Sequence, residues 1–78
     1  MEPIEVTANF DTSGNITPVF VHLKGIKYTV EKIGRQWQNE TGLYYLVMIP
    51  ADKILKIQFN TYELRWYLIP YGSNRNNA

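Results

Sequence analysis

Apolar residues recur at every second position in short segments of this chain, and clusters of turn-forming residues separate those segments. In the first segment Ile4, Val6, Ala8 and Phe10 alternate with polar residues, until residues 11–15 interrupt the pattern. A period of two is typical of β-strands that pack one face against a core. No segment keeps the period of a helix. The pattern therefore predicts an all-β domain.

Six segments carry the strand pattern, and tight turns join several of them. Lys24 and Gly25 form the expected centre of a hairpin, with Gly25 supplying a positive φ. After Val30 the apolar phase slips, because Ile33 follows at three residues rather than two and precedes Gly34; this predicts a bulge or sharp bend. The expected strands cover residues 4–10, 19–23, 26–30, 43–49, 54–60 and 64–69.

Short connections between successive strands favour an antiparallel meander. We expect five to six strands that curl into a small barrel-like roll, which would protect the sheet edges. Residues 1–71 would form this single domain, and residues 72–78 a disordered C-terminal tail. Residues 43–49 are apolar at every position, which predicts a central strand covered on both faces or one whose outer face binds a partner.

The composition excludes several classes of protein. A formal net charge of +1 is neither the strongly basic charge that indicates phosphate backbones as partners nor the strongly acidic charge of a mimic or a solvating tail. The absence of cysteine rules out disulfides and thiolate chemistry. No apolar run reaches the ~20 residues of a membrane-spanning helix. The N-terminal residues are acidic and lack the apolar stretch of a signal peptide, so we expect a cytoplasmic protein. We expect no cofactor and no metal.

Catalytic residue patterns are weak. His22 is the single histidine and lies in an apolar segment, where a structural or surface role is the usual one. The acidic residues are scattered, and Glu63 between Tyr62 and Leu64 is the carboxylate with the best chance of partial burial. We therefore expect no enzymatic activity. The alternative is a small accessory enzyme that uses Glu63 or His22 as its acid or base.

Basic residues fall close to aromatic residues along the chain. Lysine and arginine follow a phosphate backbone while aromatic rings stack on unpaired bases, so this combination is typical of single-stranded nucleic-acid surfaces. A small β-barrel offers such a platform. We therefore predict a non-enzymatic binding module with single-stranded nucleic acid as its ligand. The candidate contact residues are Lys24, Lys27, Lys32, Arg35, Trp37, Tyr44, Lys56, Arg65 and Tyr67.

The same residues also have structural interpretations. Lysines on outer strand faces keep edges soluble, and tyrosines cover a second sheet face or form protein–protein surfaces. Trp66 is in phase with Leu64 and Leu68, which predicts a place in the core, whereas the broken phase leaves Trp37 open. The alternative function is a protein-interaction or homodimerisation domain, pairing through an edge strand or the face of residues 44–48.

Several motifs resemble a family of short bacterial β domains of unassigned function. They are ITPVFV at residues 16–21, KGIKYTV at residues 24–30, Trp37, Gly42, Tyr44 with Tyr45, EL at residues 63–64 and WYL at residues 66–68. The resemblance implies a bacterial cytoplasmic protein and supplies no catalytic residue. Some members are encoded near translesion-polymerase genes, which favours nucleic acid by genomic association alone. Ile26 stands where the family has arginine after glycine, so no role for that arginine carries over.

Overall fold

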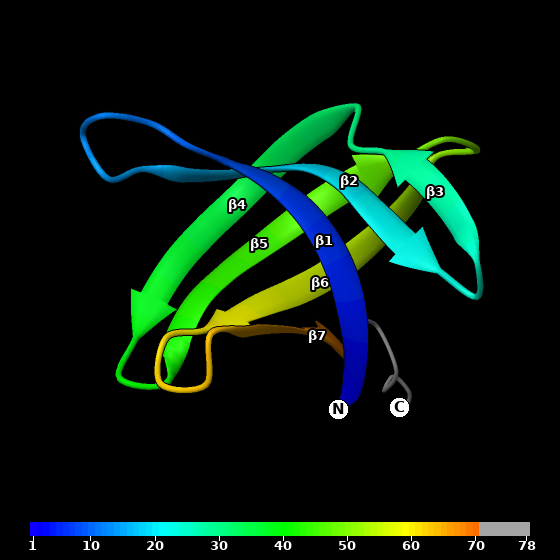
Figure 1. The fold of residues 1–78 in the computed structure, drawn as a ribbon. Coiled ribbons are helices and arrows are strands. Elements are labelled where there is room, and N and C mark those ends of the chain that lie inside the picture. Colours follow the sequence, from blue (N-terminus) through cyan, green and yellow to red (C-terminus); the bar gives the residue numbers. More distant parts are fainter. Residues whose placement is uncertain (71–78) are drawn as a thin grey trace.

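The computed structural model describes residues 1–70 and consists of seven β-strands, with no helix in that range (Figure 1). The predicted tail at residues 72–78 lies outside the described residues. Among the residues described, no helix has the length and apolar character to cross a membrane. The strands are β1 (Glu2–Phe10), β2 (Ile16–Leu23), β3 (Ile26–Thr29), β4 (Lys32–Asn39), β5 (Gly42–Ile49), β6 (Lys53–Asn60) and β7 (Arg65–Ile69).

All seven strands belong to one antiparallel sheet with the order β3-β2-β1-β7-β6-β5-β4. It consists of two meanders, an N-terminal one (β1–β3) and a C-terminal one (β4–β7), which join where β1 pairs with β7. The sheet curls into a half-barrel (Figure 1). The predicted all-β antiparallel fold is confirmed, but the meander is interrupted once, between β3 and β4.

The interruption has a physical cause at Val30 and Glu31. The Val30 amide donates to the Val19 carbonyl at 2.9 Å, and the Glu31 amide donates to the Met48 carbonyl at 2.8 Å. The two residues therefore bridge β2 and β5 across the curled sheet, instead of turning the chain back beside β3. These hydrogen bonds satisfy backbone groups that a plain loop would leave to water.

Strand β4 is the one that the apolar pattern missed. Its register against β5 shifts between Ile33 and Gln36, so the predicted bulge at Gly34 is confirmed, but the chain continues as a strand beyond it. Only Ile33 and Trp37 are large apolar residues here, and the bulge places them out of phase. An edge strand needs few apolar residues, because only one neighbour packs against it.

Each expected strand differs from the observed one by one to three residues at one end, and two of these differences have a clear physical cause. Strand β2 begins at Ile16 and contains Pro18, which lies where the β1–β2 register shifts beside Ala8. A proline is tolerated there because the ladder is already interrupted. The alternation predicts that Leu64 packs with Trp66 and Leu68, yet Leu64 is 73% exposed with φ 59° in the turn before β7.

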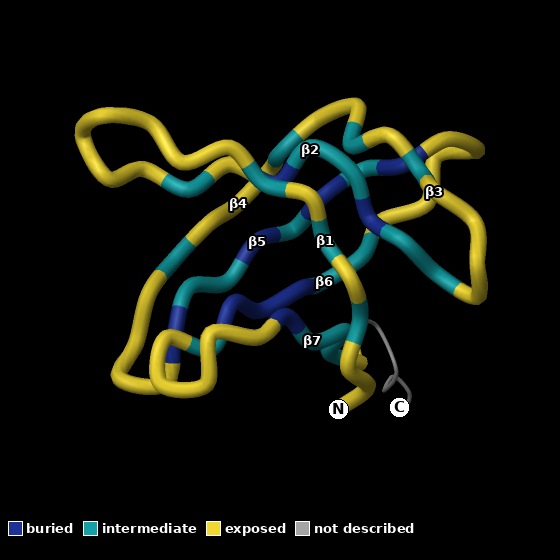
Figure 2. Tube along the Cα trace, viewed as in Figure 1, coloured by how far each residue is buried: buried dark blue, intermediate teal, exposed yellow. Residues whose placement is uncertain are grey.

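The core lies on the concave side of the curled sheet, where the buried segments of β5, β6 and β7 face β1 and β2 (Figure 2). Trp66 is buried, as predicted, and its ring lies 5.0 Å from that of Phe59 and 5.8 Å from that of Tyr45. The Tyr45 hydroxyl donates to the Ile16 carbonyl at 2.7 Å, which satisfies its polar end inside the core. The buried apolar residues are Val21, Tyr45, Val47, Ile49, Ile57, Phe59 and Trp66.

Two turns depend on backbone conformations that side chains disfavour. Lys24 and Gly25 have φ of 50° and 80°, which confirms the tight hairpin between β2 and β3. Gly42 begins β5 at a close approach to β6, where an added Cβ would lie 2.2 Å from the Phe59 carbonyl oxygen. Only glycine lets the β4–β5 turn pack this closely against β6.

Candidate functional site

Four side chains form a row across the convex face of the C-terminal meander. Trp37 pairs with Tyr44, Tyr44 with Gln58, and Gln58 with Tyr67. Neighbouring side chains on a strand point to opposite faces, and Tyr45, Ile57 and Trp66 point into the core, so these four point outward. We call Trp37, Tyr44, Gln58 and Tyr67 the outer row.

The first two members of the outer row form a flat aromatic pair. The rings of Trp37 and Tyr44 are stacked, with centroids 5.3 Å apart and planes 5° from parallel. Both side chains are half-buried, which leaves part of the pair exposed to solvent. Trp37, whose position the sequence left open, therefore lies outside the core.

A hydrogen-bonded chain fixes the Tyr44 ring. Its hydroxyl lies 2.8 Å from the Thr41 hydroxyl, which donates to the Asn39 side-chain oxygen at 2.7 Å, and the Gln58 amide donates to Tyr44 at 3.1 Å. Hydrogen bonding with Thr41 lowers the pKa of Tyr44, and the Gln58 amide, which donates to the Tyr44 oxygen, lowers it further. These contacts hold the ring in one orientation.

Gln58 is buried although it faces outward. Its side chain is 2% exposed, and its Oε1 atom has no hydrogen-bond partner within the described part of the chain. The Nε2 atom is the one that supports Tyr44 and, at 3.4 Å, Thr41. Gln58 therefore acts as a support beneath the aromatic pair.

Two cations flank the Trp37 ring. The Arg35 guanidinium carbon lies 5.1 Å from the ring centroid and the Lys56 Nζ atom 5.5 Å, so both are within cation–π range. Arg35 reaches the ring from the bulge in β4, and Lys56 from β6. The structure thus brings together four of the predicted contact residues: Arg35, Trp37, Tyr44 and Lys56.

Charge is segregated in the C-terminal meander. Strands β4 to β7 contain no acidic residue along their full described lengths, and their acidic neighbours lie in the connections between strands. The strand cations are Lys32, Arg35, Lys53, Lys56 and Arg65. Lys53 pairs with buried Ile49 and shares its face, so the convex face has the other four. Because opposite charges are confined to the turns, the convex face carries a local positive charge that the net charge of +1 conceals.

Tyr67 closes the outer row at β7. Its hydroxyl donates a hydrogen bond to the Glu63 carboxylate in the preceding turn, and this bond raises the pKa of Tyr67. Arg65 lies two residues earlier on the same face and is exposed. Glu63 thus has an identifiable structural partner in Tyr67.

The remaining predicted lysines lie elsewhere. Lys24 is in the β2–β3 turn, and Lys27 on β3 places its Nζ atom 4.4 Å from the Phe20 ring centroid. This hairpin is at the right of Figure 1, whereas the β4–β5 turn is at the lower left. His22, opposite Lys27, has its Nε2 atom 3.1 Å from the Thr7 hydroxyl. The structure does not bring Lys24 and Lys27 to the outer row.

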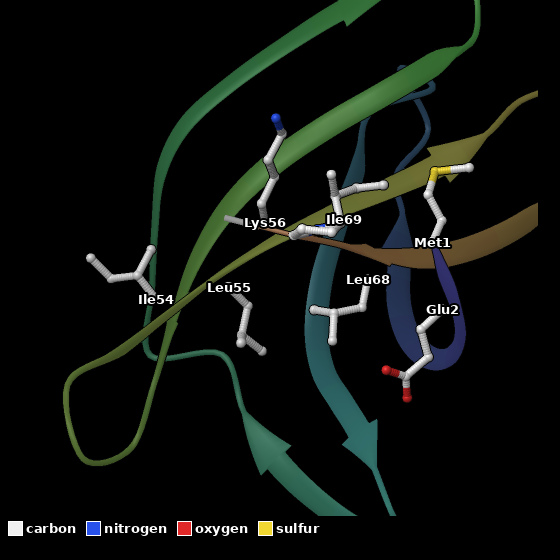
Figure 3. Close-up of a pocket in the computed structure, with 8 residues that line it drawn as sticks. Met1, Glu2, Ile54, Leu55, Lys56, Leu68 and Ile69 are labelled. Atoms are coloured by element: carbon white, nitrogen blue, oxygen red, sulfur yellow. The ribbon is translucent and has the colours of Figure 1, made fainter. Parts of the chain in front are cut away.

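Each of two hollows is lined in part by one of the cations that flank Trp37. One, of about 260 Å³, is lined by Lys32, Gly34, Arg35, Leu46, Met48 and Ile54. The other, of about 380 Å³, lies around Ile54, Lys56 and Ile69, where Lys56 projects from β6 between the two isoleucines (Figure 3). The apolar run at residues 43–49 signalled Leu46 and Met48, whereas nothing in the sequence pattern singled out Ile54 or Ile69.

Comparison with models of protein families, with curated proteins and with solved structures finds no match. The resemblance to short bacterial β domains therefore stays a prediction.

Proposed function

We propose that the protein is a non-enzymatic module that binds single-stranded nucleic acid across the outer row. The observation that carries the proposal is the parallel stack of Trp37 on Tyr44, flanked by Arg35 and Lys56. Stacking of a base on an aromatic side chain contributes ~1–3 kcal/mol, and adjacent cations follow the phosphate backbone. A duplex hides the faces of its bases, so the ligand is single-stranded.

Each residue type has a defined task in this proposal. Bases stack on the outer faces of the Trp37–Tyr44 pair, and Arg35 and Lys56 move from the Trp37 ring to neutralise phosphates beside the bases. Lys32, Arg65 and Tyr67 extend the binding surface along the same convex face. The acid-free strands support the assignment, because the carboxylate that contacts the outer row, that of Glu63, lies in the turn before β7 and accepts a hydrogen bond from Tyr67. Lys24 and Lys27 have no task in it.

The two tryptophans provide a built-in test. NMR signals of the indole amides are followed while a short mixed-sequence single-stranded DNA is added at low and at physiological salt. We expect the Trp37 signal to move and saturate, more weakly at higher salt, while buried Trp66 stays in place as the internal control. A Trp37 signal that does not move at low salt would reject the proposal.

A second candidate function is self-association through β4. This eight-residue strand ends the sheet order, and Leu46 and Met48 lie on the adjoining outer face. Sedimentation at increasing protein concentration tests it. An apolar interface would persist as salt rises, whereas phosphate binding would weaken steeply.

A further inference from the structure

The hollow of about 260 Å³, which Arg35 connects to the Trp37 ring, has aliphatic side chains in its lining. Stacking of bases on aromatic rings does not require such side chains. Leu46, Met48 and Ile54 line it with aliphatic or thioether groups, and Lys32 and Arg35 line it too. Gly34 in the β4 bulge contributes no side chain to it. We call this hollow the β4–β6 groove.

The groove is contiguous with the aromatic pair. Arg35 lines the groove and also lies over the Trp37 ring. Leu46 follows Tyr44 by two residues on the same face of β5, which places it about 7 Å further along the strand. A nucleotide stacked on Trp37 would therefore have its neighbour over the groove, with a phosphate near Arg35.

The size and chemistry of the groove narrow the choice of base. Pockets for drug-sized ligands have volumes of ~300–1,000 Å³, so this smaller hollow suits part of a single base. Where Leu46, Met48 and Ile54 line the groove, no side chain offers a strong hydrogen bond, and a polar base edge placed there would lose its hydration without compensation. The two cations in the lining, Lys32 and Arg35, are donors that suit phosphate oxygens. Thymine is the DNA base with a methyl group, which such a lining accommodates favourably.

We propose that the β4–β6 groove takes the methyl group of a thymine next to the base stacked on Trp37. This inference rests on the proposed function and makes the ligand thymine-containing single-stranded DNA. Burial of one methyl group corresponds to ~0.8 kcal/mol, so thymine should be preferred over uracil about fourfold at this position. Lys32 and Arg35 would hold the flanking phosphates.

The test compares oligo(dT) with oligo(dU) of equal length, which differ only in the methyl group, by fluorescence titration at low salt. We expect oligo(dT) to bind about fourfold more tightly. Equal affinities would overturn this inference and leave the proposed function standing. Absence of binding by both oligonucleotides would overturn the two together.

Two variants locate the preference. Ile54→Thr makes the groove polar at a residue that is 46% exposed, and its matched control is Ile26→Thr, a 53% exposed isoleucine on β3. Gly34→Val narrows the groove, and a Cβ at Gly34 meets only the Leu46 carbonyl oxygen at 3.7 Å, an ordinary contact. The preference for oligo(dT) should vanish in Ile54→Thr and Gly34→Val and persist in Ile26→Thr. A preference that persists in all three would overturn the assignment to this groove.

Discussion

The two meanders share one sheet, yet their convex faces differ in charge. On the N-terminal meander Glu5, His22 and Lys27 lie opposite one another on three neighbouring strands, so acidic and basic groups are interleaved. On the C-terminal meander the strands carry only cations, and the outer row adds aromatic rings.

The difference shows how a binding face is distinguished from a solvated one in a domain this small. Interleaved charges satisfy one another and water, and they leave no net field for an ionic ligand. Charge of one sign beside flat rings attracts an anion with planar groups. The difference between the two convex faces depends on packing, charge and hydrogen bonding. A single substitution can change each of these separately, so each can be tested.

Gly42→Ala should have the largest effect, on the free energy of unfolding. The new Cβ would lie 2.2 Å from the Phe59 carbonyl oxygen, a backbone atom of the β5–β6 ladder. We expect a decrease of about 3–5 kcal/mol, near the upper limit for one substitution, measured by urea denaturation. The control is Gly14→Ala in the β1–β2 turn, where φ is 86° and no atom lies within 4 Å. It should be destabilised only by the ~1–2 kcal/mol of a left-handed conformation; equal effects would contradict the packing argument.

Trp37→Ala should reduce affinity for single-stranded DNA by roughly 5- to 150-fold, the equivalent of ~1–3 kcal/mol of stacking. The matched substitution on the other convex face is Phe20→Ala, which removes a ring that also has a cation, Lys27, above it. Its affinity should equal that of the wild type in the same fluorescence titration. Similar reductions in both variants would mean that the two faces do not differ in function.

Lys56→Gln should lower the salt dependence of binding. For a single strand, each phosphate that is no longer neutralised by a cation reduces the slope of log K against log salt by ~0.7. Affinity is measured over a salt series, with Lys27→Gln on the N-terminal meander as the control that leaves the slope unchanged. If Lys27→Gln lowered the slope as much, the charge contrast between the faces would have no bearing on binding.

The smallest expected effect is a separation of two tyrosine ionisations within the outer row. Tyr44 should ionise below the ordinary pKa of about 10, because its hydrogen bonds with Thr41 and Gln58 lower its pKa. Tyr67 should ionise above it, because its hydroxyl donates a hydrogen bond to Glu63. The Tyr67 hydrogen bond therefore stabilises the fold below the unfolded pKa, and this stabilisation disappears as pH rises through the folded one. The Tyr44 contribution is fully present above the unfolded pKa and disappears as pH falls through the folded one.

An alkaline absorbance titration measures both ionisations, and Tyr44→Phe and Tyr67→Phe assign them. Tyr44→Phe should remove the earliest transition. Tyr67→Phe should reduce the late transition without abolishing it, because burial also raises the pKa of Tyr45. The reverse assignment would contradict the hydrogen-bond network described for the outer row.

Strand-period patterns predicted most of the fold because alternation is a local property. Trp66 was placed correctly in the core, since Leu68 and Trp66 lie in phase on a regular strand. The pattern failed where local order is broken: at β4, where the bulge shifts Trp37, and at Leu64, where φ 59° turns the side chain outward. The alternation of apolar residues predicts which way a side chain points only where the backbone is extended, so it fails at a bulge or at a residue with positive φ.

The sequence predicted which residues could contact a ligand, but it could not predict which of them lie together in space. Arg35, Trp37, Tyr44 and Lys56 come from three strands, and only the register of β4 against β5 and β6 brings them together. Lys24 and Lys27 are close to Arg35 in sequence but belong to the opposite edge of the sheet. Proximity along the chain is therefore a poor guide to proximity in space at the point where the meander is interrupted.

The pairing of β1 with β7 has a consequence for the order of folding. Both meanders close through hairpins of few residues, whereas the pair of Glu2 and Leu68 must close a loop that spans nearly all of the described chain. Contacts between residues distant in sequence form slowly, because closing the long loop lowers the entropy of the chain before the new contact can compensate with a favourable energy. The meanders should therefore form first and join last. Since the outer row lies wholly within β4 to β7, its surface is assembled by local contacts before the half-barrel closes.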